Sequence, residues 1–365
     1  LALQRVGLPA RVYEQAPEIG AVGAGIGLWP GALQSLREIG VAQWFWELPV
    51  CPFRWARTAT TRGRQLVGFP VAPMTGGLGY VVRRADLHRA LLEPLDPEAV
   101  LTGKRLVTLV QDADGVALGF ADGTTAHAGL VIGADGLRSV VREAVLGRQE
   151  PRYSGETAYR GMAAISVADP GLMCEMQGGG RRGAVHPVSA DHVYWWSTRR
   201  APRDGVESPE QRKGALLEAL ARWAGGLPEA IEATPAQEIL QNDLYDRDPV
   251  AGWSSGRVTL LGDAAHPTTP NLGLGGCMAI EDALVLARAL RQTSAYGPAF
   301  AQYEFERHTR TAQVVRVSRW MGRTGSLRNP LAVAAWRGAT AATPARVAAG
   351  MLTRQVTYTP GPLVS

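Results

Sequence analysis

A strand-end carboxylate followed by a glycine-rich loop is the part of this sequence with the clearest chemical meaning. The apolar run at 258–261 leads into Asp263, and Gly273, Gly275 and Gly276 come just before a helical pattern. This order predicts a buried strand, an acid at its end, a loop that lets a ligand approach the backbone, and a helix whose free N–H groups point at that ligand. The pattern therefore predicts a site for a large, partly anionic cofactor.

Two further predicted strands end in an acid, Glu14 after 11–13 and Asp135 after 130–134. A buried carboxylate is costly unless bound groups or backbone N–H groups satisfy it. For Asp135 the partner is either a ligand or the start of the following helix, and the two roles can coexist. A dinucleotide-binding fold places its G-x-G-x-x-G turn about 20 residues before the acid that binds the adenosine ribose. Counting back from Glu14 leads past residue 1, so we expect the sequence to begin after that turn.

Length and composition restrict the possible classes of protein. The chain has 365 residues, 46% of them hydrophobic, which predicts a folded protein of two domains or one large α/β unit. Its apolar runs are far shorter than the roughly 18 residues of a membrane helix, and residues 1–8 do not resemble a signal peptide. Three cysteines without CxxC spacing indicate neither a disulfide framework nor a metal site, so we expect a cytoplasmic protein. A net charge of +5 is weak evidence for nucleic-acid binding, and none is expected.

Hydrophobic periodicity predicts alternating strands and helices with an inserted sheet. Helices are predicted at 30–40, 84–95, 208–223, 277–290 and 298–323. Strands are predicted at 105–110, 116–120 and 124–127, and the inserted sheet has strands at 162–167, 183–188 and 192–198. Beyond residue 323 the Ala- and Arg-rich sequence gives no clear pattern. No acidic residue follows Glu306, which fits either a solvated helix face or a basic patch for a membrane surface, a partner or an anionic nucleotide.

Four motifs in this order and separation resemble the flavin-dependent aromatic-ring hydroxylases of the para-hydroxybenzoate hydroxylase fold. They are Glu14, Arg84-Ala85-Asp86-Leu87, Gly133-Ala134-Asp135-Gly136 and Gly262-Asp263-Ala264-Ala265-His266-Pro267. The resemblance implies an α/β fold, in which a Rossmann-like FAD-binding domain is interrupted by a mixed β-sheet substrate domain and followed by long C-terminal helices. The implied domains are 1–150 (first part of the FAD-binding domain, without its first strand and glycine loop), 151–250 (substrate domain), 251–297 (return of the FAD-binding domain) and 298–365 (C-terminal helical region).

The resemblance also implies the cofactors, FAD with NADPH or NADH as a transient reductant. It assigns Glu14 to the adenosine ribose, Arg84 to the phosphates or flavin, and Asp263 to a ribitol hydroxyl. Asp135 is placed where FAD and the reducing nucleotide meet. The remaining cofactor residues form the loop that passes the flavin ring and starts the next helix, namely Pro270, Gly273, Gly275 and Gly276. The simpler alternatives are a surface acid at 14, a solvated arginine at 84, and a glycine turn packed for steric reasons; we expect His266 to fix its loop by hydrogen bonding.

Arg182 and Tyr194 are spaced as in the FAD-dependent urate hydroxylases, where the matching residues meet the substrate, and they are the candidate catalytic residues. Alternation along a strand puts Tyr194 and Trp196 on one face and Trp195 on the other, so at least one of them is expected in the core. Asn271 stands where that group carries an acid, and an amide cannot act as a carboxylate base. The substrate is therefore expected to differ from urate.

The leading hypothesis is an FAD-dependent monooxygenase that inserts one oxygen atom of O2 into a small aromatic or heteroaromatic molecule through a flavin hydroperoxide. This reaction requires no acid–base triad, the short apolar runs predict no transmembrane segment, and a monomer or homodimer is expected. One alternative is an epoxidase or related flavin oxygenase that acts on an apolar lipid. The other is a flavin-poor accessory or binding protein, because a chain without the phosphate loop would hold the cofactor weakly.

Overall fold

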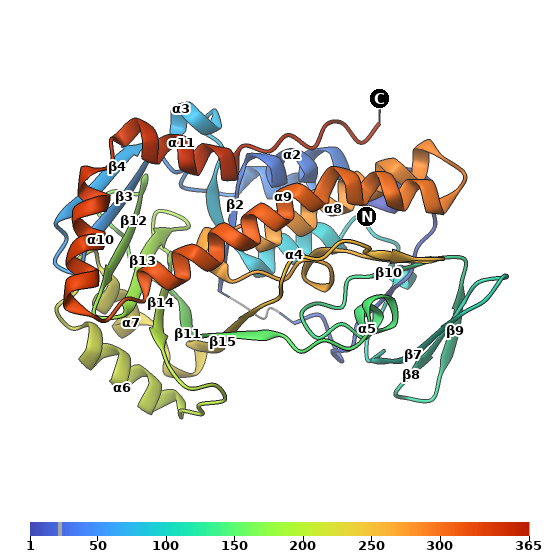
Figure 1. Cartoon of the computed structure of the whole chain (residues 1–365), viewed down its shortest axis with the longest axis horizontal. Helices are drawn as coiled ribbons and strands as arrows, with labels where there is room; N and C mark the ends of the chain where they lie inside the picture. The colour runs from blue at the N-terminus through green and yellow to red at the C-terminus, as the bar shows by residue number, and fades with distance from the viewer. Residues whose placement is uncertain (21–23, 365) are drawn as a thin grey trace.

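The computed structural model describes residues 1–20 and 24–364. Its largest element is a seven-stranded sheet at one end of the molecule, in the order β15-β11-β14-β13-β12-β3-β4 (Figure 1). Its strands are β3 (Trp55–Thr60), β4 (Gln65–Pro70), β11 (Arg152–Ala163), β12 (Leu172–Gly178), β13 (Arg181–Pro187), β14 (Val193–Arg200) and β15 (Leu240–Asp246). β12 and β3 are parallel and the other neighbours antiparallel. The strands β3 and β4, which precede residue 151 in the chain, thus complete the inserted sheet.

The two faces of this sheet have different partners. On one face, Trp195 and Val185 pack with apolar residues of α6 (Pro209–Leu220) and α7 (Leu227–Ala233), and the indole N–H of Trp195 donates to Thr234 Oγ1 at 2.8 Å. Because side chains alternate along a strand, the strand pairing places a polar and aromatic set on the opposite face. That set includes Arg182, His186, Tyr194, Trp196 and Glu175.

The other end of the molecule consists of short strands, in parallel and antiparallel pairs, and the helices between them. β1 (Val12–Tyr13) pairs in parallel with β6 (Val100–Leu101), and β10 (Val131–Gly133) with β17 (Val258–Leu260), which also pairs with β16 (Ser254–Ser255). A meander of β7 (Leu106–Gln111), β8 (Val116–Phe120) and β9 (Thr125–Ala128) flanks them, and β2 (Gly25–Leu28) pairs with β5 (Tyr80–Arg83). Helices in this part are α1 (Ala2–Arg5), α2 (Pro30–Ile39), α4 (Arg84–Leu92) and α5 (Val140–Leu146), whereas α3 (Ala72–Thr75) follows β4 and lies beside α11 (Figure 1). The chain also forms short 3₁₀ turns at η1 (Gln43–Glu47), η2 (Pro97–Ala99), η3 (Ala236–Glu238), η4 (Gly262–Ala264) and η5 (Pro270–Leu272).

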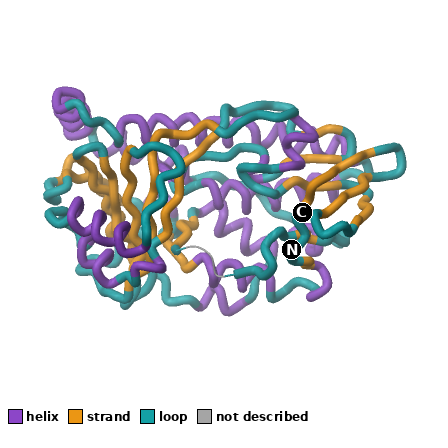
Figure 2. Tube along the Cα trace, turned by 90° about the horizontal axis from the view of Figure 1, so that it is seen from below, coloured by secondary structure: helices purple, strands orange, loops and turns teal. Residues whose placement is uncertain are grey.

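Long helices connect the two ends. After α8 (Gly275–Gln292), α9 (Tyr296–Gly325) runs along most of the length of the molecule (Figures 1 and 2). Near its start, Phe300 and Tyr303 are buried in the same apolar cluster as the strands around β17. Near its end, Gly322 and Gly325 lie against side chains of the seven-stranded sheet. α10 (Pro330–Ala342) and α11 (Ala345–Val356) then cover β4 at the sheet edge.

The predicted fold class is confirmed, including the meander and the long C-terminal helices. The predicted strand at 162–167 is wrong, because β11 ends at Ala163 and the chain leaves the sheet before Pro170, which has no N–H to donate. Strand β12 was not predicted, since its sequence contains no β-branched residue. Within the described residues, no helix is both long and apolar enough to cross a membrane.

Candidate functional site

The carboxylate of Asp263 lies on the turn after β17. The preceding residue, Gly262, has a φ of +61°, a left-handed value that suits glycine, and a Cβ there would approach Ala279 of α8 to 3.1 Å. Asp263 itself is exposed, and in 1–20 and 24–364 no residue hydrogen-bonds to its side chain. Nevertheless the surrounding protein desolvates the carboxyl group and raises its pKa, an effect that the nearby His266 and Arg84 oppose. This acid therefore has acceptor capacity left for a ligand hydroxyl.

A buried ionic network holds the turn that carries Asp263. Asp282 of α8 accepts the N–H of Gly262 at 3.1 Å and lies 2.6 Å from Nε2 of His266, which confirms the loop-fixing role predicted for this histidine. From α9, Arg307 donates to Asp282 at 2.7 Å and to Glu281 at 2.8 Å. Burial alone would raise the pKa of Asp282, but the charges of His266 and Arg307 lower it to about 2. The strand end is thus fixed by charges on two helices.

The glycine loop ends in an open helix N-terminus. Gly273 has a φ of +63°, and a Cβ there would meet no atom of residues 1–20 and 24–364 within 4 Å. α8 begins at Gly275 with no side-chain cap, and Gly276 is exposed but lies so close to β2 that a Cβ would come within 2.8 Å of Ile26 Cδ1. A flat group can therefore approach the backbone here, and the positive end of the 18-residue helix favours an edge that carries negative charge.

Arg84 connects this loop with the other predicted cofactor residues. It begins α4, and its Nε lies 3.4 Å from Nε2 of His88 one turn later. Burial and the charge of Arg84 lower the pKa of His88, whereas the carboxylate of Glu14 raises it, so both charged groups lie near this ring. The charge of Arg84 also lowers the pKa of Asp263 and thereby opposes the effect of desolvation on that carboxyl group. One oxygen of Glu14 accepts the N–H of Ala16 at 2.8 Å.

An open cavity of about 620 Å³ lies beside this cluster. Ala85, Arg89 and Leu92 of α4 form one wall, and Pro97 and Val100 contribute to the other. Its volume falls within the range of about 300–1,000 Å³ that small-molecule sites occupy. Neither Glu14 nor Arg84 lines the cavity, which is adjacent to Arg84 in the chain through Ala85.

Asp135 is engaged by its own chain. Its carboxylate accepts the N–H groups of Val140 and Val141 at 2.8 and 3.2 Å, and it also accepts the hydroxyl of Ser139. These contacts place the negative charge at the N-terminus of α5, where the helix dipole stabilises it. The helix-start alternative is therefore present in the structure, and the cofactor role of Asp135 stays a prediction.

The polar face of the large sheet meets the loop through β2. A Cβ on Gly25 would lie 2.6 Å from Cγ of Tyr194, while the next residue, Ile26, contacts Gly276. Two consecutive residues of β2 therefore touch the predicted substrate side and the predicted cofactor loop. As the alternation predicts, Tyr194 and Trp196 share this face and Trp195 is in the core on the other.

Arg182 lies under the loop rather than at the surface. Only 1% of the residue is exposed, and its guanidinium donates to Oδ1 of Asn271 and contacts Glu175 at 3.3 Å. The amide of Asn271 in turn donates to Ser318 O of α9 at 2.8 Å and to Thr269 Oγ1 at 2.9 Å. The structure thus brings Arg182 and Asn271 together. The assignment of Arg182 as a catalytic residue remains a prediction.

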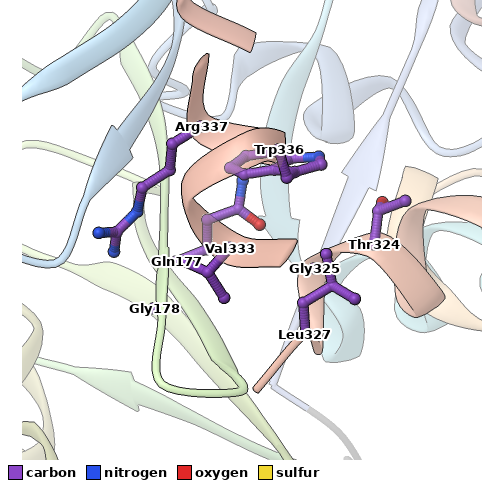
Figure 3. Close-up of a pocket in the computed structure, with 8 residues that line it drawn as sticks. All are labelled: Gln177, Gly178, Thr324, Gly325, Leu327, Val333, Trp336 and Arg337. Carbon is purple, nitrogen blue, oxygen red and sulfur yellow. The ribbon is translucent and has the colours of Figure 1, made fainter. Parts of the chain in front are cut away.

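The end of α9 leaves room for Arg182 because it carries glycine. At Gly325 a Cβ would lie 2.7 Å from Nε of Arg182, and at Gly322 it would lie 2.7 Å from Nδ2 of Asn271. Figure 3 shows Gly325 beside a small pocket between this end of α9, Gln177 of β12 and Trp336 of α10. The position of α9 is therefore coupled to that of the loop at Asn271 through Gly322, and to that of Arg182 through Gly325.

We expect Gly325→Ala to displace Arg182 and to destabilise the protein by about 1–3 kcal/mol, the usual effect of overpacking a buried contact. The matched control is Gly338→Ala in α10, where a Cβ would meet nothing within 4 Å. That change should be neutral or stabilising by up to about 1 kcal/mol, since alanine favours helix. Urea denaturation measures the free energy of unfolding of both variants. An equal effect of the two substitutions would contradict the packing role of Gly325.

Sequence reasoning missed several residues of the site. Asp282 and Arg307 gave no signal as a pair because they lie on different helices, although an arginine facing an acid on a neighbouring helix could have been proposed once both helices were placed. His88 could have been found as the residue one turn after Arg84. Groups that could hold a metal ion are absent from residues 1–20 and 24–364.

Comparison with known proteins agrees with this geometry. A family model described as FAD binding domain matches residues 2–318. The chain is 35% identical over 340 residues to aurachin C monooxygenase/isomerase of Stigmatella aurantiaca, a match that covers 91% of this chain and 87% of the relative. It is 34% identical over 325 residues to the FAD-dependent urate hydroxylase of Klebsiella pneumoniae, with 87% and 85% covered.

A solved structure gives the same result for the fold. The chain is similar to Klebsiella pneumoniae HpxO complexed with FAD and uric acid, with a TM-score of 0.89 and 31% identity. That match covers 99% of this chain and 93% of HpxO. A further relative, 6-hydroxynicotinate 3-monooxygenase of Bordetella bronchiseptica, is 33% identical over 345 residues and covers 87% of this chain and 86% of its own length.

Proposed function

Since the chain belongs to the family of FAD-dependent aromatic monooxygenases, we propose that it uses NADPH or NADH and O2 to insert one oxygen atom into a small aromatic or heteroaromatic compound. The observation that carries this proposal is the double contact of β2. Gly25 packs on Tyr194, and Ile26 packs on Gly276 at the start of α8. A flat cofactor edge held at α8 would therefore lie next to a sheet face that carries aromatic and polar side chains.

The residues of the loop fit FAD. Asp263 has an exposed carboxylate that would accept a hydrogen bond from a ribitol hydroxyl, and the uncapped N-terminus of α8 would stabilise the negative charge that a flavin gains on reduction. Gly273, Gly275 and Gly276 leave the backbone accessible to a flat ring. When bound, FAD supplies the redox chemistry, accepting a hydride from the nicotinamide and activating O2. The cofactor roles of Glu14, Arg84, Asp135 and Pro270 form part of the same proposal.

The substrate side has its own tasks. Tyr194 is half-buried, and the desolvation of its phenol by the surrounding protein raises the pKa, so the phenol is protonated at neutral pH and can donate a hydrogen bond. Arg182 holds Asn271 and so fixes the loop against the sheet. Phe53, Tyr194 and Trp196 supply apolar surface that excludes water from a planar substrate. The chemistry proposed requires no acid–base triad.

The test is a screen of FAD-loaded protein with phenolic, purine and quinoline-like compounds. We expect a flavin absorbance band near ~450 nm and an oxidation of NADPH or NADH that rises several-fold with at least one compound. Oxygenated product, identified by mass, separates true oxygen insertion from uncoupled oxidation. A protein that retains no flavin even with added FAD would refute the proposal and favour the accessory-protein alternative.

A further inference from the structure

His186 of β13 has one ring nitrogen that the protein engages and one that it does not. The indole N–H of Trp196 donates to His186 Nε2 at 3.1 Å. In a neutral ring an Nε2 that accepts leaves the proton on Nδ1, and burial lowers the pKa of His186 to about 4, so the ring is neutral at physiological pH. Nδ1 is buried and has no hydrogen-bond partner in the described part of the chain. A buried N–H donor without a partner is destabilising, so its retention calls for an explanation.

The surroundings of this donor indicate a ligand. Strand pairing places His186 directly opposite Tyr194, and the two rings are stacked with centroids 6.2 Å apart. Phe53 meets the imidazole edge-on at 6.0 Å. Since Tyr194 packs on β2, which contacts Gly276, the unengaged donor belongs to the aromatic face next to the predicted cofactor loop. An aromatic setting with a single N–H donor suits a planar ring that carries one acceptor.

The hydrogen bond from Trp196 alone does not account for a histidine at this position. A structural acceptor for that indole needs only Nε2, and the side chain of Trp196 is already oriented by Arg182, whose guanidinium carbon lies 5.8 Å from the ring centroid. Nδ1 contributes nothing to this arrangement. We therefore assign the Nδ1 of His186 to a ligand that binds against this aromatic face of the sheet.

We propose that the Nδ1–H of His186 donates a hydrogen bond to an oxygen acceptor of the substrate, so that the preferred substrates are planar rings bearing a ring carbonyl. The inference rests on the monooxygenase function proposed above and specifies its substrate class. His186 binds and orients the ring; it transfers no proton.

Two variants of nearly the same shape test the roles of the two ring nitrogens of His186 separately. The side-chain amide of asparagine places an N–H near the position of Nδ1, whereas that of glutamine reaches the position of Nε2. His186→Gln therefore keeps an acceptor for Trp196 and removes the proposed donor, and His186→Asn keeps the donor. The control is His192→Asn, because His192 lies in the turn before β14 and pairs with Asp191 at 2.9 Å.

The probes are two ligand pairs that differ in ring carbonyls, 4-quinolone with quinoline and xanthine with purine. Dissociation constants come from quenching of tryptophan fluorescence in FAD-loaded protein, a readout that needs no turnover. We expect the unmodified chain to prefer the carbonyl member of at least one pair about tenfold, the effect of one hydrogen bond to a desolvated group. His186→Gln should reduce that preference to near one, while His186→Asn and His192→Asn should keep most of it.

An unchanged preference in His186→Gln, or no preference for either carbonyl in the unmodified chain, would overturn the inference. The proposed function fails separately, through loss of flavin or of ligand-stimulated NAD(P)H oxidation. A protein that oxidises NAD(P)H with a ligand but shows the same preference in His186→Gln would refute only the role of His186. Melting temperatures of the three variants show whether each is folded, and the two at position 186 decide the question together.

Discussion

Replacement of Asp263 by alanine is expected to leave the chain folded and to remove most of its flavin. No described residue depends on this carboxylate for a hydrogen bond, and its charge is partly desolvated, so its loss should not cost stability. A ribitol hydroxyl bonded to it would lose a charge-assisted hydrogen bond of about 1.5–3 kcal/mol, which weakens FAD roughly ten- to a hundredfold. Flavin absorbance of the purified variant measures the loss, and circular dichroism checks the fold.

The matched control for this prediction is Asp114→Ala. Asp114 is another exposed aspartate, in the turn between β7 and β8. The flavin content of the Asp114→Ala variant should equal that of the unmodified chain. Asp263→Asn should fall between, because an amide oxygen still accepts a hydrogen bond but carries no charge. Full flavin retention in Asp263→Ala would remove Asp263 from the cofactor site.

Replacement of Asp282 by asparagine is expected to have the largest effect on stability. Asp282 is fully buried between Arg307 and His266, and the change leaves a buried guanidinium with less compensating charge. Breaking a buried ion pair in this way costs about 3–5 kcal/mol. The free energy of unfolding in urea measures the loss. Asp248→Asn is the control, because Asp248 pairs with Arg319 at the exposed surface, where a pair contributes about 0–1 kcal/mol.

The lowered pKa of Asp282 predicts that the stability of the protein depends on pH. The pKa of Asp282 in the folded protein is about 2, below the ordinary carboxyl value of about 3.9, so its stabilising contribution is complete above pH 4. That contribution is lost as the pH falls from about 4 toward 2, and unfolding should become easier across this window. Asp282→Asn should show a weaker acid response in the same window. A similar acid response in both proteins would assign the effect to other carboxylates.

The strand, loop and helix start of the candidate cofactor site could be predicted from the sequence because their signals are local. A strand, the acid at its end, three glycines and a helix start lie within about 20 residues of one another, the scale of a single strand–loop–helix unit. The structure places Asp263, Gly273 and Gly276 in the arrangement that this order predicts. The alternation at Tyr194, Trp195 and Trp196 was predictable for the same reason, since the two faces of a strand follow from parity alone.

The rest depends on contacts between distant segments, which a single sequence does not record. The joining of β3 to β12 pairs residue 55 with residue 172, and nothing in either segment indicates the other. Arg182 could be named as a candidate from its spacing, but its burial follows from Gly325 on a helix more than one hundred residues later. Asp135 shows a further limit. The same strand-end position serves a helix start or a ligand, and the choice between them is made by surroundings that spacing cannot reveal.

Asn271 carries a consequence for how this loop can change. One side of its amide accepts from Arg182 and the other donates to the backbone carbonyl of Ser318. A carboxylate at this position would satisfy the arginine but would repel the carbonyl. Whether an acid or an amide is tolerated at 271 is therefore decided jointly by the loop and by the stretch of α9 from 318 to 325. Substitutions on these two elements should therefore show strong epistasis, and an acid at 271 should be tolerated only when the facing stretch of the helix changes with it.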